Sequence, residues 1–147
     1  MKLVICEKPS VGAAVAAALG VTGKKDGYIE NDKYIISWCI GHLVQLSEAA
    51  AYGEQYRKWS YDSLPILPQE WQYTVAADKG KQFKILKDLM HRADVSEVVN
   101  ACDAGREGEL IFRFVYHQAG CKKPMRRLWI SSMEESAIKA GFENLKD

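Results

Sequence analysis

Two apolar runs in this sequence each end in an acidic residue. Glu7 follows Leu3–Cys6, and Asp103 follows Val95–Cys102. Runs of this length and composition are typical of strands that are buried on both faces of a sheet. The carboxyl ends of parallel strands lie at one edge of their sheet, where α/β proteins build their sites. We therefore expect Glu7 and Asp103 to lie close together.

Two further acids follow Asp103 at short spacing. Glu107 comes four residues later, in the expected first turn of a helix, and Glu109 follows it. Several carboxylates in one small region repel each other unless a proton or a cation lies between them. Oxygen ligands without a nearby set of Cys and His favour Mg²⁺. The alternative is structural, because acids at strand ends form turns and acids in the first turn of a helix complement its dipole.

Cations accompany both acidic positions. Lys8 adjoins Glu7, and Arg106 stands between Asp103 and Glu107. A lysine and a guanidinium beside exposed amides suit a phosphate group. Internal ion pairs with the neighbouring acids explain the same spacing, so both interpretations stay open.

Residues 56–61 interleave aromatic and cationic side chains, with Trp59 at the centre. Such a combination can stack on nucleic-acid bases while it contacts phosphates. The aromatics could equally pin a loop to the core.

Strands alternate with helices along the chain. The apolar spacing predicts helices over residues 9–19, 79–92, 107–119 and 133–145, and strands over residues 3–6, 28–30, 34–39, 72–75, 95–101 and 127–130. Residues 21–27 are expected to form a loop, and residues 48–70 a long excursion with little regular structure. This order predicts an α/β fold, with one domain over residues 1–147 and a mostly parallel sheet covered by helices on both faces.

The pattern also predicts details of the last helices. The helix over residues 107–119 should direct four apolar side chains inwards: Leu110, Ile111, Phe114 and Val115. Ser131 or Ser132 should cap the N-terminus of the last helix. Lys122 and Lys123 with Arg126 and Arg127 suggest a basic patch.

The composition is that of an ordinary globular protein. The 147 residues are 48% hydrophobic and 27% charged, with a net charge of +1. This balance argues neither for nor against nucleic acid as a partner, so any basic surface must be local. The longest apolar stretch is too short to span a bilayer. None of the four cysteines is spaced as C-x-x-C, and we expect a cytoplasmic protein with reduced thiols and no membrane contact.

The acidic segments resemble the two signature motifs of the Toprim domain, the metal-binding domain shared by topoisomerases, primases and some nucleases. Residues 7–10 (Glu-Lys-Pro-Ser) match the first motif, and residues 103–109 (Asp-Ala-Gly-Arg-Glu-Gly-Glu) match the second. Segments at residues 38–43, 59–68 and 129–132 are similar to type IA DNA topoisomerases, and to the topoisomerase III subfamily in particular. The resemblance covers essentially the whole chain.

This resemblance implies Mg²⁺-dependent breakage of one DNA strand, strand passage and rejoining. In that family a tyrosine attacks a phosphodiester and becomes linked to the 5′ phosphate. Glu7 would act as general acid/base toward the 3′ oxygen, with Lys8 and Arg106 at the scissile phosphate. Mg²⁺ would be held by Glu7, Asp103 and Glu107, and a single-stranded DNA segment would be contacted by Lys8, Trp59 and Arg106.

The sequence departs from the family pattern at two points. Gly105 stands where the second acid of the triad belongs, so metal contact there requires water, the backbone or a neighbour such as Glu109. None of the seven tyrosines is followed two residues later by the arginine that marks the family's nucleophile. We therefore expect an N-terminal part of a longer topoisomerase, inactive alone, with the tyrosine on the remaining domains of the same polypeptide. The alternatives are a stand-alone Toprim nuclease and a metal-dependent nucleic-acid-binding module.

Overall fold

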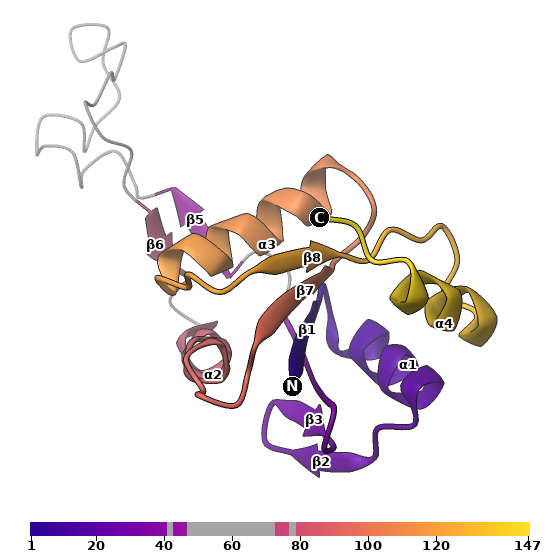
Figure 1. Ribbon diagram of the computed structural model, residues 1–147. Helices are drawn as coiled ribbons and strands as arrows, with labels where there is room; N and C mark the ends of the chain where they lie inside the picture. Colours follow the sequence, from indigo (N-terminus) through magenta and orange to yellow (C-terminus); the bar gives the residue numbers. More distant parts are fainter. Residues whose placement is uncertain (41–42, 47–72, 77–78) are drawn as a thin grey trace, which may run out of the picture.

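A six-stranded sheet with the order β2-β3-β4-β1-β7-β8 forms the centre of the computed structural model (Figure 1). The structure describes residues 1–40, 43–46, 73–76 and 79–147. Four strands are parallel neighbours: β4 (Tyr34–Trp38), β1 (Lys2–Cys6), β7 (Glu97–Ala101) and β8 (Met125–Arg127). Beyond β4, the antiparallel strands β3 (Tyr28–Glu30) and β2 (Gly23–Lys25) extend the sheet. The mostly parallel sheet confirms the predicted fold class.

A separate antiparallel ribbon consists of β5 (Val44–Leu46) and β6 (Tyr73–Val75). The excursion predicted over residues 48–70 lies between these two strands in the sequence and outside the described residues. The prediction for Trp59 lies outside them for the same reason.

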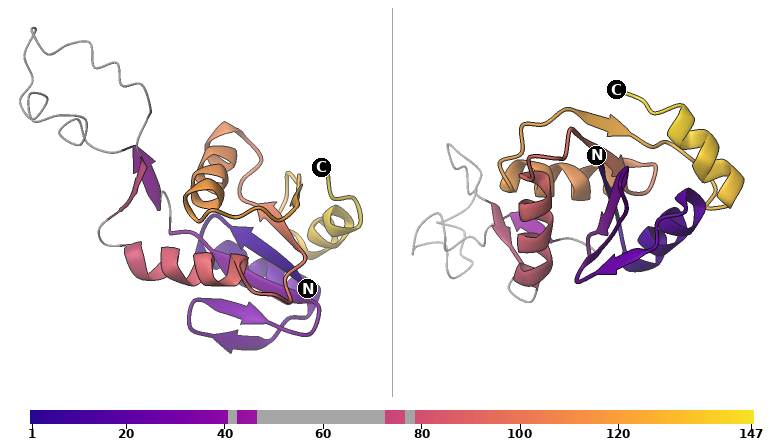
Figure 2. Two further views of the ribbon diagram at one scale, coloured as in Figure 1. Left: turned by 60° about the vertical axis from the view of Figure 1, so that its left-hand side comes forward. Right: turned by 60° about the horizontal axis from the view of Figure 1, so that its bottom comes forward.

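Helices cover both faces of the sheet. Helices α1 (Pro9–Leu19) and α4 (Glu135–Glu143) pack on one face, and α2 (Gly80–Met90) and α3 (Arg106–Gln118) on the other (Figure 2). The central strand β1 explains this arrangement, because its successive side chains point to opposite faces. Leu3 and Ile5 enter the core beneath α2 and α3, whereas Val4 and Cys6 enter the core beneath α1 and α4. Within the described residues, no helix is both long and apolar enough to cross a bilayer.

The loop predicted over residues 21–27 is wrong in part, because Gly23–Lys25 form the edge strand β2. This strand pairs antiparallel with β3, with Lys24 opposite Ile29. Its Gly-Lys-Lys sequence has no apolar alternation from which a strand could be predicted. The backbone hydrogen bonds to β3 are what hold it in the sheet.

Helix α3 is turned slightly from the predicted orientation, although Phe114 packs partly buried against the core as expected. Ile111 and Val115 are buried as expected, but Leu110 is 40% exposed and Phe112 is completely buried. Gly108 accounts for the rotation. A Cβ atom at Gly108 would lie only 2.2 Å from the carbonyl oxygen of Asp103, so this side of the helix must face the end of β7.

The predicted boundaries around the last strand and helix also shift. Strand β8 ends at Arg127 and does not continue to Ile130. Helix α4 begins at Glu135, and its N-cap residue Glu134 makes no side-chain cap hydrogen bond. Ser132 is therefore not the N-cap, although its hydroxyl oxygen accepts a hydrogen bond from the Glu134 backbone N–H at 3.2 Å.

Candidate active site

The two acids that follow β1 and β7 lie at the same edge of the sheet. These strands are parallel neighbours in register, with Cys6 opposite Ala101, so the chain leaves both strands at the same level. After β1 the chain enters α1 on one face of the sheet, and after β7 it enters α3 on the other. Such a reversal creates a crevice at the carboxyl ends of the strands, where α/β proteins bind ligands.

The carboxyl groups of Glu7 and Asp103 lie close together across this crevice, near enough for a hydrogen bond when one of them is protonated. The pKa of Glu7 is raised above its ordinary value of 4.5, chiefly by burial, then by the hydrogen bond to Asp103 and by repulsion from the Asp103 and Glu107 carboxylates. The positive charge of Lys8 opposes these effects. Carboxylates this close repel each other, and a cation between them would relieve the repulsion.

The raised pKa of Glu7 predicts how stability depends on pH. A carboxyl whose pKa is raised by folding stabilises the fold below its ordinary pKa, and this contribution is lost as the pH rises through the raised value. Glu7→Gln keeps a hydrogen-bonding side chain but removes the charge. We expect a higher melting temperature than wild type at pH 7, and no difference at pH 4, for protein unfolded in EDTA and followed by circular dichroism.

The matched control for this experiment is Glu143→Gln at the exposed end of α4. This variant should melt like the wild type at both pH values. A Glu7→Gln variant that is less stable than wild type at pH 7 would contradict the strained carboxyl pair.

The remaining predicted residues surround this pair. Glu107 is exposed in the first turn of α3, close enough for its charge to act on Glu7. Arg106 is exposed at the start of the same helix, and Lys8 is the exposed N-cap residue of α1. The structure therefore brings Glu7 and Asp103 together, places Glu107 near them, and leaves both cations accessible at the same edge.

Glu109 does not substitute for the missing acid at residue 105. Its Oε1 accepts a hydrogen bond from Arg113 Nε at 2.6 Å, and its Oε2 accepts one from Asn100 Nδ2 at 3.0 Å. Arg127 Nε lies 3.5 Å from the same Oε2. The Glu109 carboxylate is thus held among these three side chains.

Arg127 is the residue that sequence reasoning missed. It is only 9% exposed, so it does not belong to the predicted basic patch. One terminal nitrogen, Nη1, donates to the Asn100 backbone oxygen at 3.1 Å, to Asn100 Oδ1 at 2.7 Å and to the Cys102 oxygen at 2.8 Å. The other, Nη2, donates to the backbone oxygen of Asp103 at 2.6 Å. Arg127 thereby holds the turn that carries Asp103.

Burial lowers the pKa of Arg127, and the nearby carboxylates of Glu109, Asp103 and Glu7 oppose this effect. The signal in the sequence is an arginine directly before the apolar Leu128, at the start of a predicted strand. That signal cannot distinguish an exposed arginine from a buried one.

The donor set fits a hard divalent cation. Mg²⁺ is usually bound through one or two carboxylates and keeps several waters, so Glu7 and Asp103 suffice as protein ligands. Among the described residues, no group of three or more His, Cys, Asp or Glu side chains is arranged to hold a metal. The backbone of Gly105 is extended, and no atom lies within 4 Å of the position that a Cβ would occupy. A side chain at residue 105 would therefore meet open space.

The chain is similar to known proteins over nearly its whole length. It is 48% identical over 99% of its length to a protein named DNA topoisomerase 3 from Shouchella clausii, and 46% identical over 99% to one from Bacillus licheniformis. It spans only 20% of the length of each. The fold matches that of full-length topoisomerase I from Thermotoga maritima with a TM-score of 0.64 and 20% identity, over 99% of this chain and 21% of that one. Residues 2–133 match the Toprim domain family, and this chain belongs to that family.

Proposed function

We propose that this chain supplies the metal-binding half of a type IA DNA topoisomerase active site, as part of a longer topoisomerase III. The carboxyl pair of Glu7 and Asp103 carries the proposal, because it lies at the crevice where a Toprim domain would hold its metal. The similarity to proteins named DNA topoisomerase 3 favours a topoisomerase over the other kinds of enzyme that contain a Toprim domain.

Each residue at the edge has a role in the proposed reaction. A tyrosine on the remaining part of the polypeptide attacks the phosphorus, and the bond from phosphorus to the 3′ oxygen breaks. Glu7 donates its proton to the departing 3′ oxygen and takes a proton back on rejoining. Its raised pKa favours the protonated form that the first step needs. The exposed Lys8 and Arg106 contact the phosphate.

Mg²⁺ fits beside this pair, held by Glu7 and Asp103 with Glu107 nearby. When bound, it would stabilise negative charge on the phosphate during rejoining. Asp103 holds its place through the hydrogen bond that Arg127 donates to its backbone oxygen.

Exposed apolar side chains support a partner at this edge. Among the described residues, the exposed large hydrophobic side chains are Ile40, Leu110, Trp129 and Met133. Three of them follow the carboxyl ends of the parallel strands β4 and β8, and Leu110 lies in the second turn of α3, which begins there. Exposed apolar groups gathered at one edge mark an interaction surface. The remaining domains, with the tyrosine, would cover the part of this surface around Ile40 and Leu110.

Plasmid relaxation tests the proposed function. We expect the 147-residue chain with Mg²⁺ to leave negatively supercoiled plasmid intact, because it holds no tyrosine in the family's context. The longer protein should relax the plasmid, and Glu7→Gln in that protein should slow relaxation by about 10²–10⁴-fold, as for loss of a general acid.

The control for the plasmid assay is Lys139→Gln on the exposed side of α4, which should relax plasmid like the wild type. Mg²⁺-dependent nicking by the 147-residue chain, abolished by Glu7→Gln, would instead identify a stand-alone nuclease. Absence of relaxation by the longer protein would leave only a metal-dependent binding module.

Gly105→Asp should strengthen Mg²⁺ binding by the 147-residue chain. The substitution places a third carboxylate in open space on an extended backbone, without a clash. One more negative charge near the cation should raise the affinity by about tenfold, or about 1.4 kcal/mol. Calorimetric titration with Mg²⁺ measures it.

Gly105→Asn is the matched control, because it has the same size but adds no charge, and its affinity should equal that of wild type. Asp103→Asn should lower the affinity. If Asp103→Asn binds Mg²⁺ like the wild type, the cation is held by other acids.

A further inference from the structure

A cavity of about 880 Å³ adjoins the acidic edge beside α4. Its walls come from residues 101–104 after β7, residues 128–133 after β8, and α4 with the residues that follow it. Because β7 and β8 are parallel, both segments leave the sheet at the edge where Glu7 lies. Asp103 therefore lines this cavity and also belongs to the carboxyl pair. The volume is typical of a small-molecule site.

Trp129 gives the cavity an aromatic wall. Its side chain is among the large apolar groups left accessible, at 52% exposure. The guanidinium carbon of Arg127 lies 5.2 Å from the centre of its ring. Since Arg127 is fixed by four hydrogen bonds to the residues before and at Asp103, this contact holds the ring beside the acidic edge.

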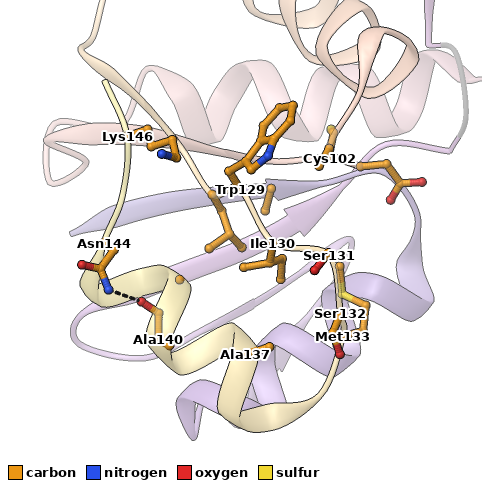
Figure 3. Close-up of a pocket in the computed structure, with 15 residues that line it drawn as sticks. Cys102, Trp129, Ile130, Ser131, Ser132, Met133, Ala137, Ala140, Asn144 and Lys146 are labelled. Atoms are coloured by element: carbon orange, nitrogen blue, oxygen red, sulfur yellow. Dashed lines mark hydrogen bonds between the residues drawn. The ribbon is translucent and has the colours of Figure 1, made fainter.

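Most of the remaining lining is apolar, and polar groups stand at its two ends. Figure 3 shows Ser131 and Ser132 at one end and Asn144 and Lys146 at the other, with Trp129 and Ile130 between them. Asn144 Nδ2 donates to the Ala140 oxygen at 2.8 Å, which leaves its Oδ1 as an acceptor. The ring of Trp129 can stack on a flat ring of the ligand. The hydroxyl, amide and ammonium groups can form hydrogen bonds with heteroatoms at the edge of that ring and with an attached phosphate.

We propose that this cavity takes one nucleobase of a single-stranded DNA segment bound across the acidic edge, stacked on Trp129. The proposal rests on the proposed function, because a strand that brings its phosphate to Asp103 passes the mouth of this cavity. Ser131, Ser132 and Asn144 contact the edge of the base, and Lys146 contacts a neighbouring phosphate. A nucleobase suits this lining, because its flat faces can pack on Trp129 and the apolar walls while its heteroatoms meet the polar groups at the two ends.

Two oligonucleotides of equal charge test this site. One is an octamer of thymidylate, and the other an octamer of abasic units with the same phosphates. We expect the 147-residue chain to bind the thymidylate octamer more tightly, measured by fluorescence anisotropy at one fixed low salt concentration. Trp129→Ala should weaken binding of the thymidylate octamer by roughly five- to a hundredfold, the range for loss of one stacked base.

Variants separate stacking from general effects. Trp129→Ala should leave binding of the abasic octamer unchanged, and Trp129→Phe should retain most of the affinity for thymidylate. Gln118→Ala, which shortens an exposed neutral side chain at the C-terminal end of α3 and outside the cavity, should bind both octamers like the wild type.

Three results would overturn the proposal. If Trp129→Ala binds thymidylate like the wild type, the base lies elsewhere and the cavity is left to the rest of the longer protein. If Trp129→Ala weakens both octamers equally, Trp129 acts through Arg127 and not by stacking. If the wild type binds both octamers equally, no base is recognised. Failure of the wild type to bind either octamer is a different result, which contradicts the proposed function itself.

Discussion

Arg127→Met is expected to lower the free energy of unfolding by about 3 kcal/mol, the lower end of the cost of breaking a buried ion pair. The methionine fills a similar volume but makes no hydrogen bond. The backbone oxygens of Asn100, Cys102 and Asp103 then lose the donors that Arg127 gives them. The lower end applies because Glu109, its charged partner, is 35% exposed and can regain water. For a chain of this size, the melting temperature should fall by about 6–12 °C.

The neighbouring residue provides the control for this prediction. Arg126 is 43% exposed, and its ion pairs with Glu97 and Asp147 are 3.8 and 3.4 Å long. Arg126→Met should therefore change the stability by no more than about 0.5 kcal/mol. Equal effects of the two substitutions would mean that Arg127 does not support the Asp103 turn. Arg127→Lys should fall between them, since a lysine retains the charge but lacks the planar set of donors.

Gly108→Ala is expected to destabilise the chain by about 1–3 kcal/mol, as for overpacking of a closely packed site. The new Cβ would lie 2.2 Å from the Asp103 oxygen and 2.8 Å from the Asp103 nitrogen. Both are backbone atoms, so α3 or the Asp103 turn must move. Mg²⁺ affinity should fall together with stability, because the displaced residue is a proposed ligand. Thermal unfolding and calorimetric titration of the same sample measure both effects.

Gly105→Ala is the matched control in the same turn. No atom lies within 4 Å of its added Cβ, so the change should alter the stability by no more than about 0.5 kcal/mol. A glycine to alanine change inside a helix ordinarily stabilises it. If Gly108→Ala also stabilises the chain, the close approach of α3 to Asp103 is not rigid.

The acids at the carboxyl edge could be predicted from the sequence for a simple reason. β1 and β7 are central strands buried on both faces, so both are rich in apolar residues, with the buried Asn100 as an exception in β7, and an acid follows each at the edge. Helix α1 could be predicted equally well. Pro9 begins the helix, and Gly20 follows its last residue in the left-handed conformation. The residues of each of these segments are enough to predict it, because no contact with a distant segment is involved.

Only the tertiary structure decided which polar residues are buried and which side of α3 is inside. Arg127 and Arg126 are adjacent and chemically identical, yet the partners of Arg127 come from β7 and α3, which precede it by some 20 residues. Leu110 and Phe112 are both apolar, and the close approach of Gly108 to Asp103 selects Phe112 for the core. The sequence by itself determined the central strands β1 and β7, the existence of the four helices and the acids that follow these strands, but not the edge strand β2. The contacts between distant segments, which no local pattern encodes, decided how Asp103 is held and what lies beside it.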